Sequence, residues 1–438
     1  MSQKNRTIWA SGVVAGCVAA AVCLPALLLG HDSRRTSSPS RLVMHEWGTF
    51  TSFAGSDGVN LEFSPVVAHG PLASYDLPRF VLGPYSQPGS VTSLFLKDRY
   101  VALQRMETPV TYFYTDVPTT VNVRVDFPQG LLTEWYPVVK NPSPSVARNA
   151  PPTVGFDHLD WGAVRLTPQE QFADIRVRSP AGKPEPASLP EVTAEDHYGR
   201  ARETDSAIVE TIDAKGGSNF EKFLFYRGLG NFALPLKLVA LGNDRFEVSN
   251  EADVASGALI LVRIEGDRVR FTLSNPVEPR ATVEISLSKT DSTIDDLADA
   301  TMRELVTAGL FEKEALAMVN TWRISWFGEQ GTRLLYLLPD TLTEQLLPLT
   351  IDPLPHEQVR VMVGRLETLT PEDSRHLAQV LAGGDPGARP TDEAIDAQLK
   401  SLGRFAEPAL RFVIGQTSDA QVRGRLELIL AHVRKTRQ

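Results

Sequence analysis

The chain has 438 residues, a formal net charge of −9 and a hydrophobic content of 42%. That length allows two or three globular domains, and the composition is ordinary for a globular protein. The negative charge argues against nucleic acid as a partner, because a nucleic-acid surface normally needs a basic face.

The first predicted element is an apolar run, Trp9–Leu29, that contains no charged residue. As a helix, these 21 residues would rise about 31 Å, close to the roughly 30 Å hydrocarbon core of a bilayer. Lys4 and Arg6 precede the run, as in the basic start of an export signal. We therefore predict an uncleaved transmembrane helix or signal segment in residues 1–30, a signal-anchor whose partner is the lipid bilayer.

The cysteine positions bear on the compartment. Cys17 and Cys23 are the two cysteines of the chain, and both lie inside the apolar run, so the body has neither a disulfide nor a thiolate metal ligand. A lipoprotein signal ending at Cys17 ("VAGC") is an alternative to the anchor, as is a buried core helix. A cysteine-free body suits an oxidising cell envelope. We predict a membrane-anchored protein with a periplasmic or extracytoplasmic body, tethered by the polar residues 31–41; a reversed anchor with a cytoplasmic body is the alternative.

Residues 42–140 are predicted to form a first antiparallel β domain. In "TTVNVRVDF", residues 119–127, Val121, Val123 and Val125 alternate with polar residues, which is the period of a half-buried strand. The extended runs "TPVTYFYTD" and "LLTEWYP" lie on either side of it, each across a short turn signal. Three such strands indicate a meander, and with "RLVMHEWGTFTSF" before them they predict a β-sandwich-like fold.

Residues 141–291 are predicted to form a second antiparallel β-sandwich-like domain with leading Pro-rich loops. Proline and serine cluster at residues 141–155, and proline again at 179–191, which is typical of loops. Several extended runs then follow one another from about residue 220 to 288. Among them, "ALILVRIEGDRVRFTLS" contains "EGDR", which is typical of a hairpin turn.

Residues 292–370 are predicted to form an α/β segment. Ser292 can cap a helix whose first turn holds two aspartates, where acids suit the helix dipole. A second helix is indicated by apolar residues spaced as on one helix face, namely Ala315, Val319, Trp322 and Trp326. The runs "RLLYLLP" and "VRVMVGRLE" that follow have the composition of strands.

Residues 371–438 are predicted to form a C-terminal helical module. Ser418 and Asp419 can cap the last helix, and "FAEPALRFVIG" with that helix resembles one HEAT-type helix pair. Such a module offers a surface for a protein partner. The predicted fold class is therefore mainly β with α: two antiparallel β-sandwich-like domains followed by a C-terminal HEAT-like module.

The stretch "HEWGTFTSF" holds the first candidate site residues, His45 and Glu46. A zinc-protease motif on a helix needs a second histidine four residues after the first, and Thr49 stands there. If the stretch is a strand, His45 and Trp47 share one face and Glu46 points to the other. The two candidates would then not converge on one ion, so a structural, hydrogen-bonding role is the favoured interpretation.

Further polar side chains lie in irregular segments and could supply a catalytic metal site. They are His158, Asp160, His197, Glu203 and Asp205. Histidine and carboxylate ligands from separate loops are typical of a metal-dependent hydrolase, with its site here between the β domains. Salt bridges between the two β domains are the favoured interpretation of the same residues. The metal and any other cofactor stay unknown.

Other motifs point away from nucleotide or acyl chemistry. "RGLGNFA" matches a dinucleotide fingerprint, but no helix start follows it, and the mechanism needs a helix N-terminus at the pyrophosphate. The chain has no phosphate loop and no nucleophile elbow. The aromatic residues Trp47, Trp135, Tyr136, Trp161, Trp322 and Trp326 could line a carbohydrate or peptide groove, but core positions are the favoured interpretation.

Several longer motifs resemble a known family. "MHEWGTFTS", "RMETPVTYFY", "GLLTEWYP", "EKFLFYRGLGNF" and "AMVNTWRISWFGEQGTRLLYLLP" are similar to motifs of an uncharacterised bacterial protein family with an N-terminal HEWGTFTS-like motif. The resemblance spans about residues 43–370. That family has no established activity, so the resemblance implies one recurrent architecture for the body and assigns no site residue.

These observations predict a membrane-anchored envelope protein that binds or scaffolds. A metal-dependent hydrolase with a His/carboxylate site between the β domains is the alternative. It would use some of the seven candidates, His45, Glu46, His158, Asp160, His197, Glu203 and Asp205.

Overall fold

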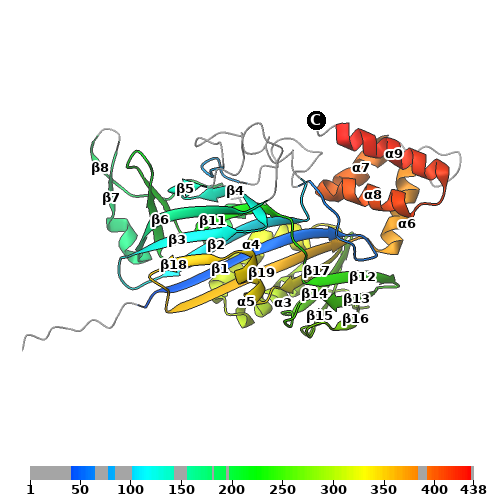
Figure 1. Cartoon of the computed structure of the whole chain (residues 1–438), viewed down its shortest axis with the longest axis horizontal. Coiled ribbons are helices and arrows are strands. Elements are labelled where there is room, and N and C mark those ends of the chain that lie inside the picture. Colours follow the sequence, from blue (N-terminus) through cyan, green and yellow to red (C-terminus); the bar gives the residue numbers. More distant parts are fainter. Residues whose placement is uncertain are drawn as a thin grey trace, which may run out of the picture. The chain divides into compact units, whose positions relative to one another are not determined.

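The computed structural model describes residues 41–64, 77–83, 101–142, 155–179, 182–193, 197–382 and 392–435 (Figure 1). Residues 1–40, which include the predicted anchor and nearly all of the tether, lie outside the described residues. The described part is mainly β, with several sheets and a C-terminal helical region. At this level the predicted fold class is confirmed.

An eight-stranded sheet, here called the large sheet, forms the centre of the fold. Its strands in spatial order are β15 (Arg268–Ser274), β14 (Leu259–Glu265), β17 (Gly331–Leu337), β19 (Glu357–Thr368), β1 (Val43–Ala54), β2 (Gln104–Tyr114), β11 (Leu224–Gly230) and β4 (Gly130–Tyr136). Neighbouring strands are antiparallel except β1 and β19, which run parallel over their whole length. The sheet takes strands from all three segments predicted between residues 42 and 370, so these segments share one core.

β1 is buried along its entire length, because both faces of the large sheet are covered here. Its side chains still alternate between the two faces. Met44 and Phe50 belong to the apolar cluster on one face, and Trp47 belongs to the cluster on the other. A strand covered on both faces does not need polar residues at every second position, which explains the composition of "HEWGTFTSF".

Two smaller sheets pack on the face of the large sheet that carries Met44 and Phe50. One contains β10 (Ser218–Glu221), β9 (Ile208–Ile212), β6 (Asp157–Thr167), β3 (Thr119–Phe127) and β18 (Leu349–Asp352), with β5 (Asn141–Pro142) paired to β6. The other contains β12 (Leu236–Gly242), β13 (Arg245–Asn250) and β16 (Thr282–Ser286). A separate ribbon of β7 (Arg176–Arg178) and β8 (Pro184–Pro186) follows the 3₁₀ helix η2 (Gln169–Asp174).

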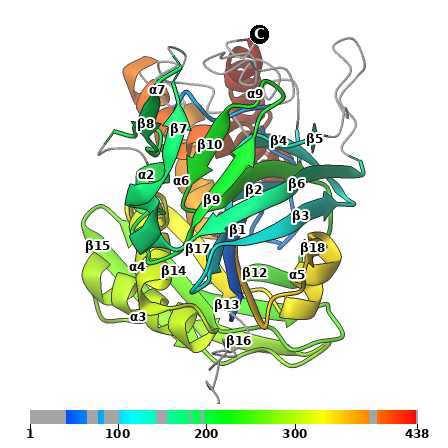
Figure 2. The same cartoon turned by 90° about the vertical axis from the view of Figure 1, so that its left-hand side faces the viewer.

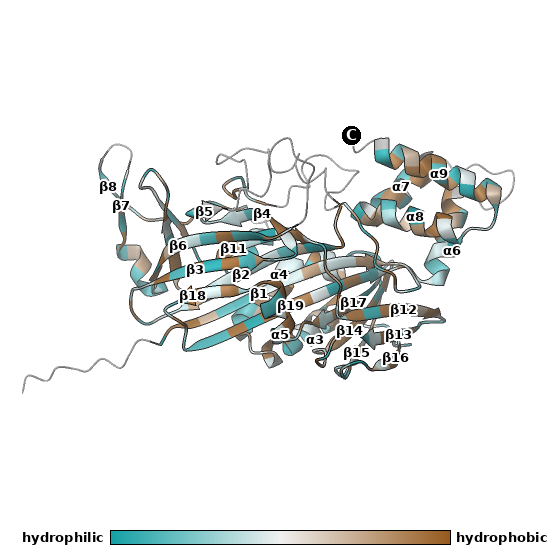
Figure 3. Cartoon of the chain, viewed as in Figure 1, coloured by the Kyte–Doolittle hydropathy of each residue, from teal (hydrophilic) through white to brown (hydrophobic). Residues whose placement is uncertain are grey.

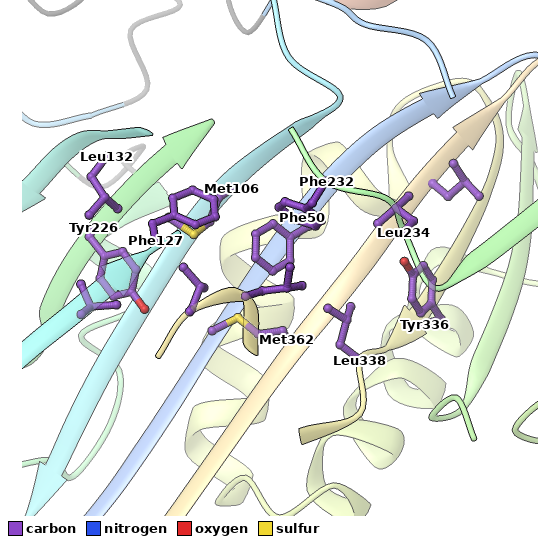
Figure 4. Close-up of a cluster of buried hydrophobic side chains, with 14 of the residues drawn as sticks. Phe50, Met106, Phe127, Leu132, Tyr226, Phe232, Leu234, Tyr336, Leu338 and Met362 are labelled. Atoms are coloured by element: carbon purple, nitrogen blue, oxygen red, sulfur yellow. The ribbon is translucent and has the colours of Figure 1, made fainter. Parts of the chain in front are cut away.

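The predicted meander needs a correction. β3 pairs with β6 and β18, whereas β2 and β4 both pair with β11 in the large sheet. The alternation seen in the sequence of β3 is real, because Val121, Val123 and Val125 are buried in the same cluster as Phe50 and Met106 of the large sheet. β3 therefore faces the large sheet rather than extending it. Figure 4 shows side chains of this cluster around β1, β2 and β19.

Helices cover the opposite face of the large sheet. α3 (Ile294–Thr307) and α4 (Glu312–Phe327) pack there, and the short α2 (His197–Arg200) contacts α4 (Figure 2). Thr293, rather than the predicted Ser292, caps α3. Its hydroxyl accepts from the Asp296 N–H (3.0 Å), and the Asp296 carboxylate accepts from the Thr293 N–H (3.0 Å). This reciprocal pair satisfies two free donors at the helix start.

The C-terminal helices form a further cluster with its own apolar core. They are α6 (Pro371–Ala382), α7 (Asp392–Leu402), the 3₁₀ turn η3 (Gly403–Phe405), α8 (Ala406–Gln416) and α9 (Ala420–Lys435), and each carries hydrophobic and hydrophilic residues (Figure 3). Asp419 caps α9, as predicted, by accepting from the Gln421 N–H at 2.7 Å. Phe53, near the end of β1, packs into this core against Phe405. A further helix, α5 (Asp340–Leu346), contacts β19.

The predicted membrane anchor is corrected by this structure. Within the described ranges, no helix combines the length and the apolar character needed to cross a bilayer. The apolar run at residues 9–29 lies outside those ranges. The predictions of a transmembrane helix, of a signal-anchor and of a membrane-anchored extracytoplasmic location are therefore corrected. The bilayer contact stays a prediction.

Candidate binding cleft

β1 places His45 against the N-terminus of α4. The His45 ring is fully buried, and its Nδ1 lies 2.7 Å from Oε2 of Glu314. Glu314 also accepts hydrogen bonds from the Phe311 backbone N–H (2.8 Å) and the Tyr114 hydroxyl (2.6 Å). Burial, with the Glu314 charge beside it, raises the pKa of Tyr114, so this phenol stays protonated and donates. His45 thus anchors the strand to a helix terminus.

Glu46 lies on the opposite face of β1, as the alternation predicts. Its carboxylate accepts hydrogen bonds from Arg360 Nε, the Tyr226 hydroxyl and the Thr111 hydroxyl, each at 2.8 Å. The side chain has no exposed surface. A buried carboxylate needs such partners because desolvation penalises an unpaired charge. His45 and Glu46 therefore serve two separate buried networks.

Four of the other five candidates have separate hydrogen-bond or ion-pair partners. Asp160 accepts from the Gly162 N–H at 2.8 Å, and His197 Nδ1 lies 2.9 Å from the Thr321 carbonyl oxygen. Glu203 pairs with Arg200 at 2.9 Å, and Asp205 pairs with Lys313 at 2.7 Å. His158 lies on β6 with Asp160.

These positions do not assemble a metal centre. Among the described residues, no three His, Cys, Asp or Glu side chains are grouped so that they could hold an ion. The six aromatic residues singled out in the sequence do not line a groove, because Trp47, Trp135, Tyr136, Trp161, Trp322 and Trp326 are all buried in the core. The candidate site of this molecule lies elsewhere.

A belt of mostly buried charges crosses the helix-covered face of the large sheet, between α4 and the C-terminal helices. Glu329 is its exposed member. The charged belt consists of Arg105, Glu107, Glu329, Arg333, Arg365, Glu367 and Arg404, with Thr51 of β1 between its two sides. The strand register creates it. Thr51 is the backbone partner of Arg105 on β2 and of Arg365 on β19, so all three side chains share this face.

The β19 side of the charged belt centres on Glu367. Arg365 Nε donates to Glu367 Oε1 at 2.6 Å, and Arg333 Nε lies 2.8 Å from the same oxygen. Arg365 also binds Glu329. Arg333 further donates to the carbonyl of Trp326 at 2.6 Å, at the C-terminus of α4, where a cation suits the helix dipole.

The β2 side of the charged belt ties the C-terminal helices to the sheet. Arg404 Nη1 donates to Glu107 Oε1 at 3.0 Å, and the Thr51 hydroxyl donates to Glu107 Oε2 at 2.8 Å. Arg105 Nε lies 3.0 Å from the same carboxylate. Burial would raise the pKa of Glu107, but Arg105, Arg404 and Arg227 outweigh it and hold that pKa far below its ordinary value of 4.5. Glu107 is therefore ionised at neutral pH.

The charged belt opens into a cleft between the large sheet and the C-terminal helices. One half has a volume of about 300 Å³ and the other about 400 Å³. Both halves are lined by Gln330, Gly331, Thr368, Leu369, Ser401 and Leu402. The first half adds Glu329, Glu367, Lys400, Arg404 and the Phe53–Phe405 pair; the second adds Arg263, Glu265, Gly266, Asp373 and His376. We call these two adjoining pockets together the binding cleft, since clefts between packed layers are common ligand sites.

Two glycines with positive φ lie in the lining of the binding cleft. Gly331, at the start of β17, has φ of +114°, and Gly403, after α7, has φ of +53°. A Cβ atom at either position would meet nothing within 4 Å, so a side chain there would project into free space. The positive φ values favour glycine for conformational reasons alone. Their effect is to bring backbone surface to the ligand space.

Sequence reasoning missed this site, although a signal for it exists. Arg105 and Glu107 stand two apart in β2, and Arg365 and Glu367 stand two apart in β19, giving "RMET" and "RLET". Residues two apart share one face of a strand. Charged pairs inside otherwise apolar strands are unusual, because charges are rarely buried without partners. What the sequence does not contain is the information that both strands flank β1.

Comparison with known proteins adds no relative. No protein-family model matches the chain, and no curated protein matches it in sequence.

Proposed function

We propose that this protein is a binding or scaffolding protein whose partner inserts a chain segment into the binding cleft. The observation that carries the proposal is the cleft itself. It lies between the large sheet and the C-terminal helices, and both apolar and charged side chains line it. Ligand sites typically combine an apolar lining with a few placed polar groups. A partner that contacts both walls would also contact the C-terminal helices, the surface that the sequence suggests for a protein partner.

The buried charges support a site held in one geometry. Arg333, Arg365 and Arg404 keep at most a small exposed fraction, and each is paired with a carboxylate. Buried ion pairs contribute little net stability compared with apolar packing, but they fix orientation. The charged belt would thus set how the helices stand on the sheet and keep the cleft open.

Three finer assignments go with this proposal. We infer that the large sheet and the smaller sheets facing it form a sandwich, that α8 and α9 form a HEAT-like pair, and that the chain belongs to the HEWGTFTS-like family it resembles. The apolar cluster shared by β1, β3 and β12 supports the first. The contact between α8 and α9 supports the second.

The test uses a random dodecapeptide library displayed on phage and panned against the full chain. Ser401 lies exposed in both halves of the cleft, so Ser401→Trp should fill it. The matched control is Ser418→Trp, an exposed serine outside the cleft. Enriched peptides should lose binding to Ser401→Trp and keep it with the control. Peptides that bind both variants equally would refute the proposal.

A further inference from the structure

Two acidic groups of the binding cleft are exposed, whereas the arginines that pair with them are buried. The side chains of Glu329 and Glu265 keep 49% and 44% of their surfaces accessible. Their partners Arg365 and Arg263 keep 0% and 10%. A ligand entering the cleft along the sheet wall therefore meets carboxylate oxygens before it meets a guanidinium group.

The loops that carry these two glutamates are linked to each other by hydrogen bonds. Gln330 Oε1 accepts from the Gly266 N–H at 2.6 Å, and Gln330 Nε2 donates to the Gly266 carbonyl at 3.2 Å. Glu329 and Glu265 are the chain neighbours of these two residues. The hydrogen bond from Arg263 lowers the pKa of Glu265, and Arg365 with Arg404 lowers that of Glu329 against the effect of burial. Both carboxylates are ionised at neutral pH.

The floor of the cleft is apolar. Phe53 and Phe405 stack with ring centroids 5.1 Å apart, and Leu369 and Leu402 lie beside them in the lining. The Phe405 ring already carries a guanidinium, that of Arg404, at 5.2 Å from its centroid. Lysine and arginine side chains have this same division, an apolar stem that packs on hydrophobic surface and a charged tip.

In the half of the cleft that holds Glu329, the helix wall carries the opposite charge. Lys400 on α7 is exposed in the cleft and makes no ion pair with any described residue. It would repel a cation on that side. The sheet wall, with Glu329 and Glu265, is therefore the place for a positive group.

We propose that the binding cleft takes a basic segment of a partner protein. The stem of one arginine or lysine would lie on the apolar floor with its charged head on Glu329, and a second basic head would lie on Glu265 in the other half. This inference rests on the proposed function and adds the chemical class of the ligand. Charge complementarity across the two walls selects it, and a carboxylate pairs with a guanidinium or ammonium by charge-assisted hydrogen bonds.

The experiment measures fluorescence anisotropy of a labelled heptapeptide of alternating leucine and arginine on the full chain, at low salt. The matched probe replaces each arginine by citrulline, which keeps the shape and removes the charge. We expect the arginine peptide to bind about tenfold more tightly than the citrulline peptide. A lysine peptide should bind between the two, because its head cannot pair bidentately.

Three single variants locate the interaction. Glu329→Gln and Glu265→Gln should each weaken the arginine peptide by about three- to tenfold. Lys400→Glu should tighten it by about threefold, and it removes no ion pair to any described residue, so it tests the idea even if a glutamine variant is unstable. Glu427→Gln, an exposed glutamate of α9 outside the cleft, is the matched control and should change nothing.

The outcomes separate the two proposals. If arginine and citrulline peptides bind equally and both are blocked by Ser401→Trp, the cleft binds peptides but the basic-ligand inference is wrong. Weaker binding of the arginine peptide to Lys400→Glu would also overturn it. If panning yields no peptide that Ser401→Trp excludes, the proposed function itself is wrong.

Discussion

The same face of the large sheet is apolar around Trp47, under α3 and α4, and charged beside the C-terminal helices. Under α3 and α4, β1 presents Trp47 and β19 presents Val361, both inside one apolar cluster. A few residues further along, the same strands present Thr51 and Arg365. Arg404 of the C-terminal helices binds Glu107 there. Apolar burial stabilises a layer without fixing its direction, whereas paired charges tolerate few geometries. We therefore expect the apolar region to supply most of the stability and the charged region to fix the geometry of the binding cleft.

Trp326→Ala should give the largest loss of stability, since it acts in the apolar cluster under α4. Trp326 has no exposed surface and packs within the α4 layer. Removing a buried tryptophan leaves a cavity that costs about 3–5 kcal/mol. Denaturant unfolding measures this loss. A change below about 1 kcal/mol would show that this layer is not where the stability lies.

Glu367→Gln should come next, with a loss of about 3 kcal/mol, because it leaves Arg333 and Arg365 buried with a weakened partner. The same unfolding experiment measures it. The exposed Glu427→Gln provides the control and should be within about 0.5 kcal/mol of the parent chain. If Glu367→Gln matched that control, the charged belt would be a set of surface-like pairs rather than a buried network.

The two regions should also differ in their response to acid. The folded state holds the pKa of Glu107 below its ordinary value of 4.5, so the ionised group contributes stability above that pH. This contribution is lost as the pH falls from about 4.5 towards the lowered folded-state pKa. Stability measured against pH should therefore fall less steeply below 4.5 in Glu107→Gln than in the parent. In Trp326→Ala the acid slope should be unchanged.

The smallest effect is expected at the start of α3. Thr293→Ala removes the hydroxyl that caps the Asp296 N–H, and such a loss costs about 1 kcal/mol. Ser292→Ala is the natural control, because the sequence alone would name Ser292 as the cap. Thermal unfolding of both variants decides the position: the melting temperature should drop for Thr293→Ala only.

The sequence by itself was enough for local structure. The alternation of Val121, Val123 and Val125 predicted a strand, and all three are buried on one face of β3. The spacing of Trp322 and Trp326 predicted a helix with a buried side, which α4 confirms. The opposite directions of His45 and Glu46 also followed from the strand period. Periodicity and capping are short-range, so the pattern of a few neighbouring residues determines them.

Only the tertiary structure decided which distant segments meet. β1 pairs in parallel with β19, which brings Thr51 beside Arg365 across 314 positions of sequence. The two Arg-x-Glu pairs in β2 and β19 become one charged belt only because both strands flank β1. No local pattern encodes such a choice, because strand order depends on which arrangement buries the most apolar surface while leaving each buried charge a partner. The binding cleft lies where these distant segments of the chain meet.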